Sequence, residues 1–101
     1  MELKLAFAEA LKEIRHHKGL TQEDFATVSS RTNISLLERA KTVPTLEKLH
    51  QLCTILEVHP ITLMAMSYTR RDNVSFKNLL AVVAAEHDAL VSADDNEGEV
   101  I

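Results

Sequence analysis

Apolar residues recur every three or four positions along most of the chain, a spacing that predicts amphipathic helices. Over residues 3–17, Phe7, Leu11 and Ile14 fall on one side of such a helix. Gly19 follows as an expected left-handed stop, and the basic residues before it suit the negative end of the helix dipole. The first predicted element is therefore a helix over residues 3–17.

The stretch over residues 20–39 predicts two short helices joined by a tight turn. Thr21 is a good N-cap for the first helix, with acidic residues in its first turn. Ser29 or Ser30 caps the second, which is expected to run to about Arg39. Four apolar residues are expected to pack these two helices into the core: Phe25, Ala26, Ile34 and Leu37.

Three more helices are predicted after a loop over residues 41–44. Thr45 caps one helix, whose apolar side holds Leu46, Leu49, Leu52, Cys53 and Leu56. Pro60 stands at the favoured first position of the next. A polar connection over residues 69–73 then leads to a last helix, from Val74 or Ser75 to about Val91. The expected fold is all-α: a five-helix domain over residues 1–69, a sixth helix within 70–91 and an acidic, disordered tail over 92–101.

Composition agrees with one helical domain. The chain has 101 residues, 46% hydrophobic and 26% charged, which can build a core, and its two Gly and two Pro argue against a turn-rich β fold. Cys53 is the one cysteine, so an intrachain disulfide is excluded, which fits a reducing compartment. No apolar run approaches the roughly 18 residues of a membrane span, and charges interrupt the N-terminus, unlike a signal peptide. A soluble cytoplasmic protein with no membrane partner is expected.

The net charge of −4 at first argues against a nucleic-acid partner. Acidic and basic residues balance over the rest of the chain, and the net charge comes from four acidic residues close to the C-terminus: Asp94, Asp95, Glu97 and Glu99. Binding to DNA needs a local positive face rather than a positive total, and residues 31–48 hold four basic against two acidic residues. A nearly neutral body predicts modest nonspecific affinity.

Several short segments occur in the order of a known family: TQEDFA, NISLLER, a basic loop, PTLEKL and HPITL. In this order they resemble the Cro/C1-type helix-turn-helix regulators of bacteria and phages, and among these the short single-domain regulators of the xenobiotic-response-element type. The resemblance covers roughly residues 4–68. It implies a lambda-repressor-like domain, a role in transcription regulation and double-stranded DNA as partner.

The resemblance also implies roles for individual residues. The helix after the turn would enter the major groove with a set of base-reading residues: Ser30, Arg31, Thr32, Asn33 and Leu36. Their chemistry suits that place, because Arg31 can bond guanine, Asn33 can bond adenine and Leu36 can contact a thymine methyl group. A second set would bind phosphates and set register and affinity: Gln22, Ser35, Arg39, Lys41, Thr42 and Thr45.

The sequence departs from the family pattern at three places. The turn between the two short helices is about two residues shorter than is common. Ala40 stands where the family often has glycine to end the reading helix: either the left-handed conformation is kept there, which costs an alanine roughly 1 kcal/mol, or the helix ends differently. Leu36 is apolar at a position often held by a polar base reader, so that it reads a methyl group or turns toward a protein neighbour.

No group of residues predicts an enzyme. A glycine-rich phosphate loop, an HExxH motif and a nucleophile with an evident base are all missing from the sequence, and no cofactor is expected. His50 and Cys53 have metal-compatible spacing, but a structural zinc site needs four ligands, so no metal is expected.

The last predicted helix has two interpretations. It either folds back to close the domain or contributes to a homodimer, for which the preceding helix, with Met64, Met66 and Tyr68, offers another surface. A homodimer would suit a palindromic operator, on which the protein would act as a repressor. The alternative function is an antitoxin-type interaction module that binds a protein partner through its C-terminal region and autoregulates its own operon.

Overall fold

A computed structural model of the chain describes residues 1–93, which form five α-helices and one 3₁₀ turn and contain no strand. In chain order the elements are α1 (Leu3–His17), η1 (Gln22–Phe25), α2 (Arg31–Glu38), α3 (Leu46–Leu56), α4 (Pro60–Asp72) and α5 (Phe76–Ala93). The all-α prediction is confirmed. Residues 92 and 93, predicted as the start of the disordered tail, belong to α5, and the rest of that tail lies outside the described residues.

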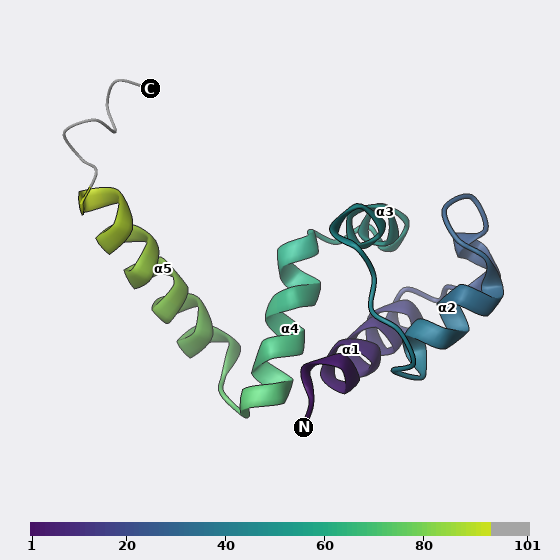
Figure 1. Cartoon of the computed structure of the whole chain (residues 1–101), viewed down its shortest axis with the longest axis horizontal. Coiled ribbons are helices and arrows are strands. Elements are labelled where there is room, and N and C mark those ends of the chain that lie inside the picture. Colours follow the sequence, from purple (N-terminus) through teal and green to yellow (C-terminus); the bar gives the residue numbers. More distant parts are fainter. Residues whose placement is uncertain (94–101) are drawn as a thin grey trace, which may run out of the picture.

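The elements from α1 to α4 pack into one body, while α5 extends away from it (Figure 1). Within the body α1 and α4 make the most extensive contact, and η1 lies against both α2 and α3. The core contains one or more large side chains from every element of the body: Leu11, Phe25, Ile34, Leu37, Leu52, Leu56 and Leu63. These are the apolar faces that the spacing of the sequence predicts.

Three predicted helix starts are made by side-chain caps. The Ser30 hydroxyl accepts from the Asn33 N–H at 3.0 Å, and the Thr45 hydroxyl accepts from the Lys48 N–H at 3.1 Å. At α4 the cap is the His59 ring, whose Nδ1 accepts from the N–H of the second helical residue at 2.9 Å. These bonds satisfy N–H groups that a helix leaves without a partner in its first turn.

The expected count of six α-helices is wrong, because the predicted second helix is the single 3₁₀ turn η1. Thr21 does begin it, and its N–H donates to the Asp24 carboxylate at 2.7 Å. After Phe25 the chain continues in turns, and Ala26, expected in the core, is exposed. The segment from Ala26 to Ser30 contains β-branched and serine residues, which favour turns and caps over helix interiors. The C-terminal helix is consequently the fifth α-helix, not a sixth.

A further helix boundary and one burial differ from expectation. Residues 69–72, predicted as a connection, continue α4 to Asp72, and Asn73 ends it with a left-handed φ of 55°. The helix therefore crosses the expected domain boundary at residue 69. Leu46, expected on the apolar side of α3, is 85% exposed because it opens the helix beside the loop rather than over the core.

The apolar stripe of α5 is largely uncovered. The large apolar residues of α5 that reach solvent are between 41% and 69% exposed: Phe76, Leu80, Val82, Val83, Leu90 and Val91. The helix diverges from α4 after the turn at residues 73–75, and the two helices form a V (Figure 1). The expectation that the last helix folds back and closes the domain is therefore not met.

Candidate nucleic-acid interface

Polar side chains from η1 and α2 line one open hollow on the surface of the body. Its lining residues are Gln22, Arg31, Thr32, Ser35 and Arg39. The sequence assigned Arg31 and Thr32 to bases and the other three to phosphates, and the structure brings all five together. Several donors on one face can bind several oxygens of a nucleic-acid backbone or the edge of a base.

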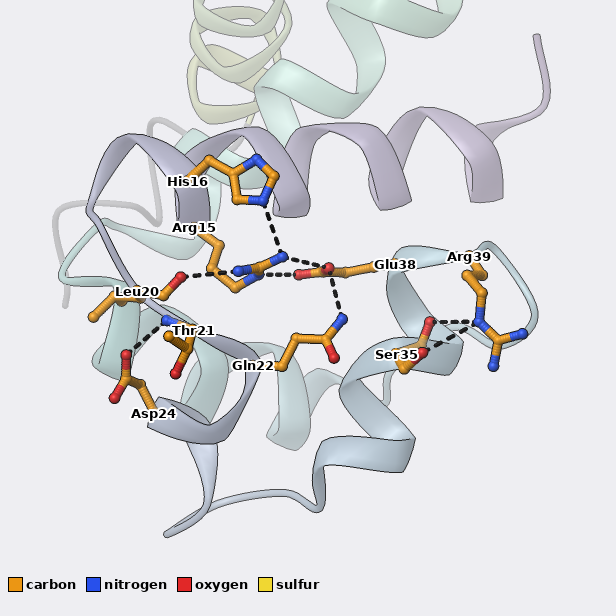
Figure 2. A network of polar contacts seen from close by, with 9 residues as sticks. All are labelled: Arg15, His16, Leu20, Thr21, Gln22, Asp24, Ser35, Glu38 and Arg39. Atoms are coloured by element: carbon orange, nitrogen blue, oxygen red, sulfur yellow. Dashed lines mark hydrogen bonds and ion pairs between the residues drawn. The ribbon is translucent and has the colours of Figure 1, made fainter.

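Gln22, one of the residues of this hollow, is held by a buried ion pair between α1 and α2 (Figure 2). Arg15 donates from Nε to Glu38 Oε2 at 2.5 Å and from Nη2 to Oε1 at 2.9 Å, and the two side chains are only 10% and 3% exposed. Arg15 Nη1 also donates to the Leu20 carbonyl at 2.8 Å, and Arg15 Nη2 lies 3.1 Å from His16 Nε2. Gln22 donates its amide to Glu38 Oε1 at 3.1 Å. One carboxylate therefore positions a guanidinium inside the body and an amide at its surface.

The environment of Glu38 keeps its carboxylate charged. Burial alone would raise the pKa of this group, because a poorly solvated site disfavours charge. The hydrogen bonds from Arg15 and Gln22, with the positive charges of Arg15 and Lys12, outweigh that effect, and the pKa of Glu38 is lowered overall. The acceptor that holds Gln22 is therefore ionised at neutral pH.

The outer rim of the hollow contains weaker contacts. Arg31 Nη1 lies 3.4 Å from the Glu23 carboxylate, and both side chains are mainly solvated. Arg39 Nε donates to the Ser35 hydroxyl at 3.2 Å and approaches its carbonyl at 3.4 Å (Figure 2). Exposed contacts of this kind contribute at most about 1 kcal/mol each, so a bound ligand can replace them.

Ser30 and Asn33, which the sequence also assigned to base reading, take part in the helix cap. The Ser30 hydroxyl accepts from the Asn33 backbone, and the Asn33 amide donates to the Ser29 hydroxyl at 2.7 Å. Leu36 is half-buried. These side chains have less free bonding capacity than Arg31 and Thr32, whose positions in the first turn of α2 are exposed.

The loop after α2 presents Lys41, Thr42 and Thr45 to solvent, separately from the hollow. Ala40 adopts the left-handed conformation, with φ of 59°, and the Lys41 N–H bonds back to the Leu36 carbonyl at 2.9 Å. Of the two alternatives for this helix end, the left-handed one is therefore present, made by an alanine instead of a glycine. It turns the chain sharply and exposes the Lys41 side chain beside the end of α2.

Arg15 and Glu38 are functional residues that the sequence patterns above do not single out. A signal was present, because Arg15 follows Leu11 by four residues and Glu38 follows Ile34 by four, which places both charges on inner helix faces. Two opposite charges on the inner faces of two helices that pack together predict a buried pair. Lys48 was likewise counted only as a positive charge, whereas its ammonium group bonds the Val28 carbonyl and fixes the turn before α2.

Other candidate chemistry is weak within the described part of the chain. Cys53 is buried, and burial raises the pKa of its thiol to about 11, which disfavours the reactive thiolate. Residues 1–93 contain no cluster of three or more side chains able to hold a metal ion. None of the described helices has the combination of length and apolar character that crossing a bilayer requires.

These features are those of a helix-turn-helix protein: the capped helix α2, a preceding turn with a fixed glutamine, and a basic loop. Residues 6–65 match the family model of the helix-turn-helix domain, and the chain belongs to this family, as a regulator of the xenobiotic-response-element type. The crystal structure of the clp gene regulator ClgR from Corynebacterium glutamicum is similar, with a TM-score of 0.63 and 22% identity over 97% of each chain. At that identity the likeness concerns the fold alone. A search of curated proteins gives no significant match.

Family membership makes this chain a DNA-binding protein of the class that regulates transcription. The family consists of DNA-binding regulators rather than enzymes.

Proposed function

We propose that the protein represses transcription by binding, as a homodimer, to a roughly palindromic operator of specific sequence. The observation that carries this proposal is the hollow lined by Gln22, Arg31, Thr32, Ser35 and Arg39, which lies on the reading helix and the turn before it. We assign Arg31 and Thr32 to the bases and the remaining three to phosphates. In this arrangement α2 lies in the major groove of the operator.

The proposed roles follow from how each side chain is held. Gln22 has one amide hydrogen bonded to Glu38, so its other N–H is free for a phosphate oxygen. Arg31 is held only by a solvated carboxylate and can exchange it for guanine O6 and N7. Ser30, Asn33 and Leu36 supply secondary base contacts, and Lys41, Thr42 and Thr45 bind the phosphates beyond the end of α2.

Two considerations support the homodimer: the spacing of the half-sites in a palindromic operator and the exposed apolar face of α5. Two reading helices one helical turn apart, about 34 Å, match two adjacent major grooves on one side of the duplex. The exposed apolar residues of α5 supply a surface that association would remove from water. As a DNA-binding regulator without a membrane-spanning helix among its described residues, the protein is proposed to act in the cytoplasm of a bacterial cell.

The test of sequence reading is a competition between cognate and random duplex. Each good bidentate contact discriminates by about 1–3 kcal/mol, so Arg31→Ala should reduce the ratio of specific to nonspecific affinity by about 5- to 150-fold. Adding Thr32→Ala should remove most of the remaining discrimination. If specificity survives both substitutions, α2 is not the reading helix.

Phosphate contacts are tested by the salt dependence of binding. Lys41→Ala should weaken binding to all duplexes alike and reduce the slope of log affinity against log salt by about 1. Lys18→Ala removes another exposed lysine, at the end of α1, and should leave the slope unchanged. Equal effects of the two variants would indicate general electrostatics and not a contact at Lys41.

The antitoxin interpretation stays as a second candidate because the exposed stripe of α5 also suits a different protein. It predicts a small toxin-like reading frame beside the gene. It further predicts a complex whose mass is that of this chain plus the toxin. A homodimer that binds its operator and gains no mass from the neighbouring gene product would exclude it.

A further inference from the structure

Two apolar surfaces of the described chain have no cover. One is α5, whose residues Phe76, Leu80, Val83 and Leu90 follow each other at helical spacing and are all exposed. The other is a groove of about 390 Å³ between the first turns of α1, the loop before α3 and the middle of α4. We call it the α1–α3 groove and define it by Leu3, Phe7, Val43, Leu46, Leu49 and Met64.

The α1–α3 groove exposes large apolar side chains to solvent, which is unusual for a protein surface. Leu46 is 85% exposed and Val43 is 62% exposed, and both stand at its edge. Leu46 lies directly after the cap of α3, a position that charged or polar residues fill without loss to the fold. Large exposed residues around an unfilled groove mark a surface for another apolar partner.

The size of α5 argues that it contacts more than another copy of α5. An 18-residue helix is about 27 Å long, and with a face about 10 Å wide it offers a strip of only about 270 Å². A stable protein interface buries about 800 Å² per partner. A dimer held only through crossed α5 helices would be small, whereas α5 packed on the body of the partner would bury both its own stripe and the groove.

Charge favours the same pairing. Lys4 stands at the edge of the groove, and within residues 1–93 it makes no ion pair. Glu86 follows Val83 by three residues and precedes Leu90 by four, so it borders the apolar stripe, and it too has no ion pair among the described residues. An acidic residue beside the stripe and a basic residue beside the groove are complementary in sign.

We propose that α5 of one copy packs into the α1–α3 groove of a second copy, and that the reciprocal contact completes a symmetric dimer. This inference rests on the proposed homodimer and names the surface of the body that receives α5. In a two-fold interface a contact from α5 to the groove occurs twice, which doubles the area buried.

The pairing connects dimerisation to DNA contact. Val43, Pro44 and Thr45 form one wall of the groove, and the same loop contains Thr42 and Thr45, which we assign to phosphates. A partner helix against that wall would order the loop in the conformation that meets the DNA. Dimerisation would then raise the affinity of each half-site as well as joining two of them.

The experiment measures the mass of the full chain in solution by sedimentation, for the wild type and three variants. Leu46→Glu alters the groove, Val83→Glu alters the stripe, and Ile61→Glu is the matched control, an exposed apolar residue of α4 outside the groove. Glutamate in the first turn of α3 suits the helix dipole, so Leu46→Glu should fold, which circular dichroism checks. Leu46→Glu and Val83→Glu should each raise the dimer dissociation constant by about 30-fold or more, and Ile61→Glu should not change it.

A cross-linking experiment separates this pairing from an α5–α5 dimer. Leu46→Cys and Val83→Cys are made separately in a Cys53→Ser background and treated with a short bismaleimide, alone and mixed. The mixture should give covalent dimers, whereas Val83→Cys alone should give few. Efficient cross-linking of Val83→Cys to itself, with no link between residues 46 and 83 in the mixture, would overturn the proposal in favour of an α5–α5 interface.

The outcomes distinguish the two proposals. A monomeric wild type at micromolar concentration would contradict the homodimer and the groove pairing together. A dimeric wild type with an equally dimeric Leu46→Glu variant would contradict the groove pairing alone and leave the homodimer intact. Loss of the dimer in Leu46→Glu and Val83→Glu, but not in Ile61→Glu, is the result that the pairing requires.

Discussion

The helices α3 and α5 have similar apolar spacing, but the apolar face of α3 is buried and that of α5 is exposed. Leu52, Cys53 and Leu56 of α3 are at most 1% exposed, whereas Phe76 and Leu90 of α5 are 42% and 69% exposed. Periodicity shows that a helix has an apolar face, but it does not show which chain covers that face. The core of the body, from α1 to α4, is covered by the body's own residues, whereas the apolar face of α5 is left for another surface.

The largest expected difference between these regions comes from removing one phenylalanine from each. Phe25 is fully buried, so Phe25→Ala should lower the free energy of unfolding by about 3–5 kcal/mol. Phe76 is partly exposed, so Phe76→Ala should change the stability of the monomer by no more than about 0.5 kcal/mol. Urea unfolding at several protein concentrations measures both.

Concentration is the control in that comparison. If α5 is covered in a dimer, the loss caused by Phe76→Ala should grow as protein concentration rises, while the loss caused by Phe25→Ala should not. If Phe76→Ala lowers stability as much as Phe25→Ala does at every protein concentration, α5 is part of the body and the difference between α3 and α5 is wrong.

A second difference concerns the carboxylates Glu38 and Glu86. Glu38→Gln keeps the shape of the side chain but removes charged hydrogen bonds from Arg15 and Gln22, and should cost about 2 kcal/mol. Glu86→Gln on the solvated surface of α5 should leave the monomer unchanged. A comparable loss from both variants in thermal or urea unfolding would contradict the special position of Glu38.

The same carboxylate predicts a dependence of stability on pH. The folded pKa of Glu38 lies below the ordinary value of 4.5, so its contribution is complete above that pH and is lost as pH falls through the lowered value. The difference in unfolding free energy between the wild type and Glu38→Gln should therefore shrink in acid below about pH 4.5. A difference that stays constant down to the acid transition would show that the carboxylate is not held in its charged form.

The smallest expected difference lies at two left-handed residues, Ala40 in the body and Asn73 before α5. Their φ values are 59° and 55°. Alanine is strained there and asparagine is tolerated, so Ala40→Gly should raise stability by about 1 kcal/mol, and Asn73→Gly should change it little. Chemical denaturation measures both variants. If Ala40→Gly instead lowers the free energy of unfolding, the helix end does not need the left-handed conformation.

Much of the body could be predicted from the sequence, because local signals agree with the final packing. The helix starts at Ser30, Thr45 and Pro60 depend on residues next to them, and the structure has each where the sequence predicts it. The left-handed stop at Gly19, with φ of 70°, is equally local. Such features need no knowledge of distant parts of the chain.

The predictions that are wrong depend on competition between elements. The second helix is shortened to η1 because the segment up to Ser30 has to form both a turn and the cap of α2, and too few residues remain for a helix. Ala26 consequently leaves the core. The exposure of Leu46 and of α5 depends on which surfaces face each other, which helical spacing alone does not specify.

The candidate site likewise contains residues that the sequence predicts and residues that depend on how the helices pack. The outward residues of α2 were predictable because a helix places them on one face, and five of the predicted residues line one hollow. The pair of Arg15 and Glu38, which holds Gln22, joins residues 23 positions apart and depends on the packing of α1 against α2. Residue type and helical face together were sufficient to predict it, but only once both helices are considered as neighbours.

The most direct test of reading by α2 is selection of bound sequences from a random duplex pool by the full chain. The wild type should enrich a motif of two similar, inverted half-sites with centres about 10 base pairs apart, and Arg31→Ala should lose preference at one base pair of each half-site. No enrichment, or an enriched motif that is unchanged in Arg31→Ala combined with Thr32→Ala, would contradict recognition of DNA through this helix.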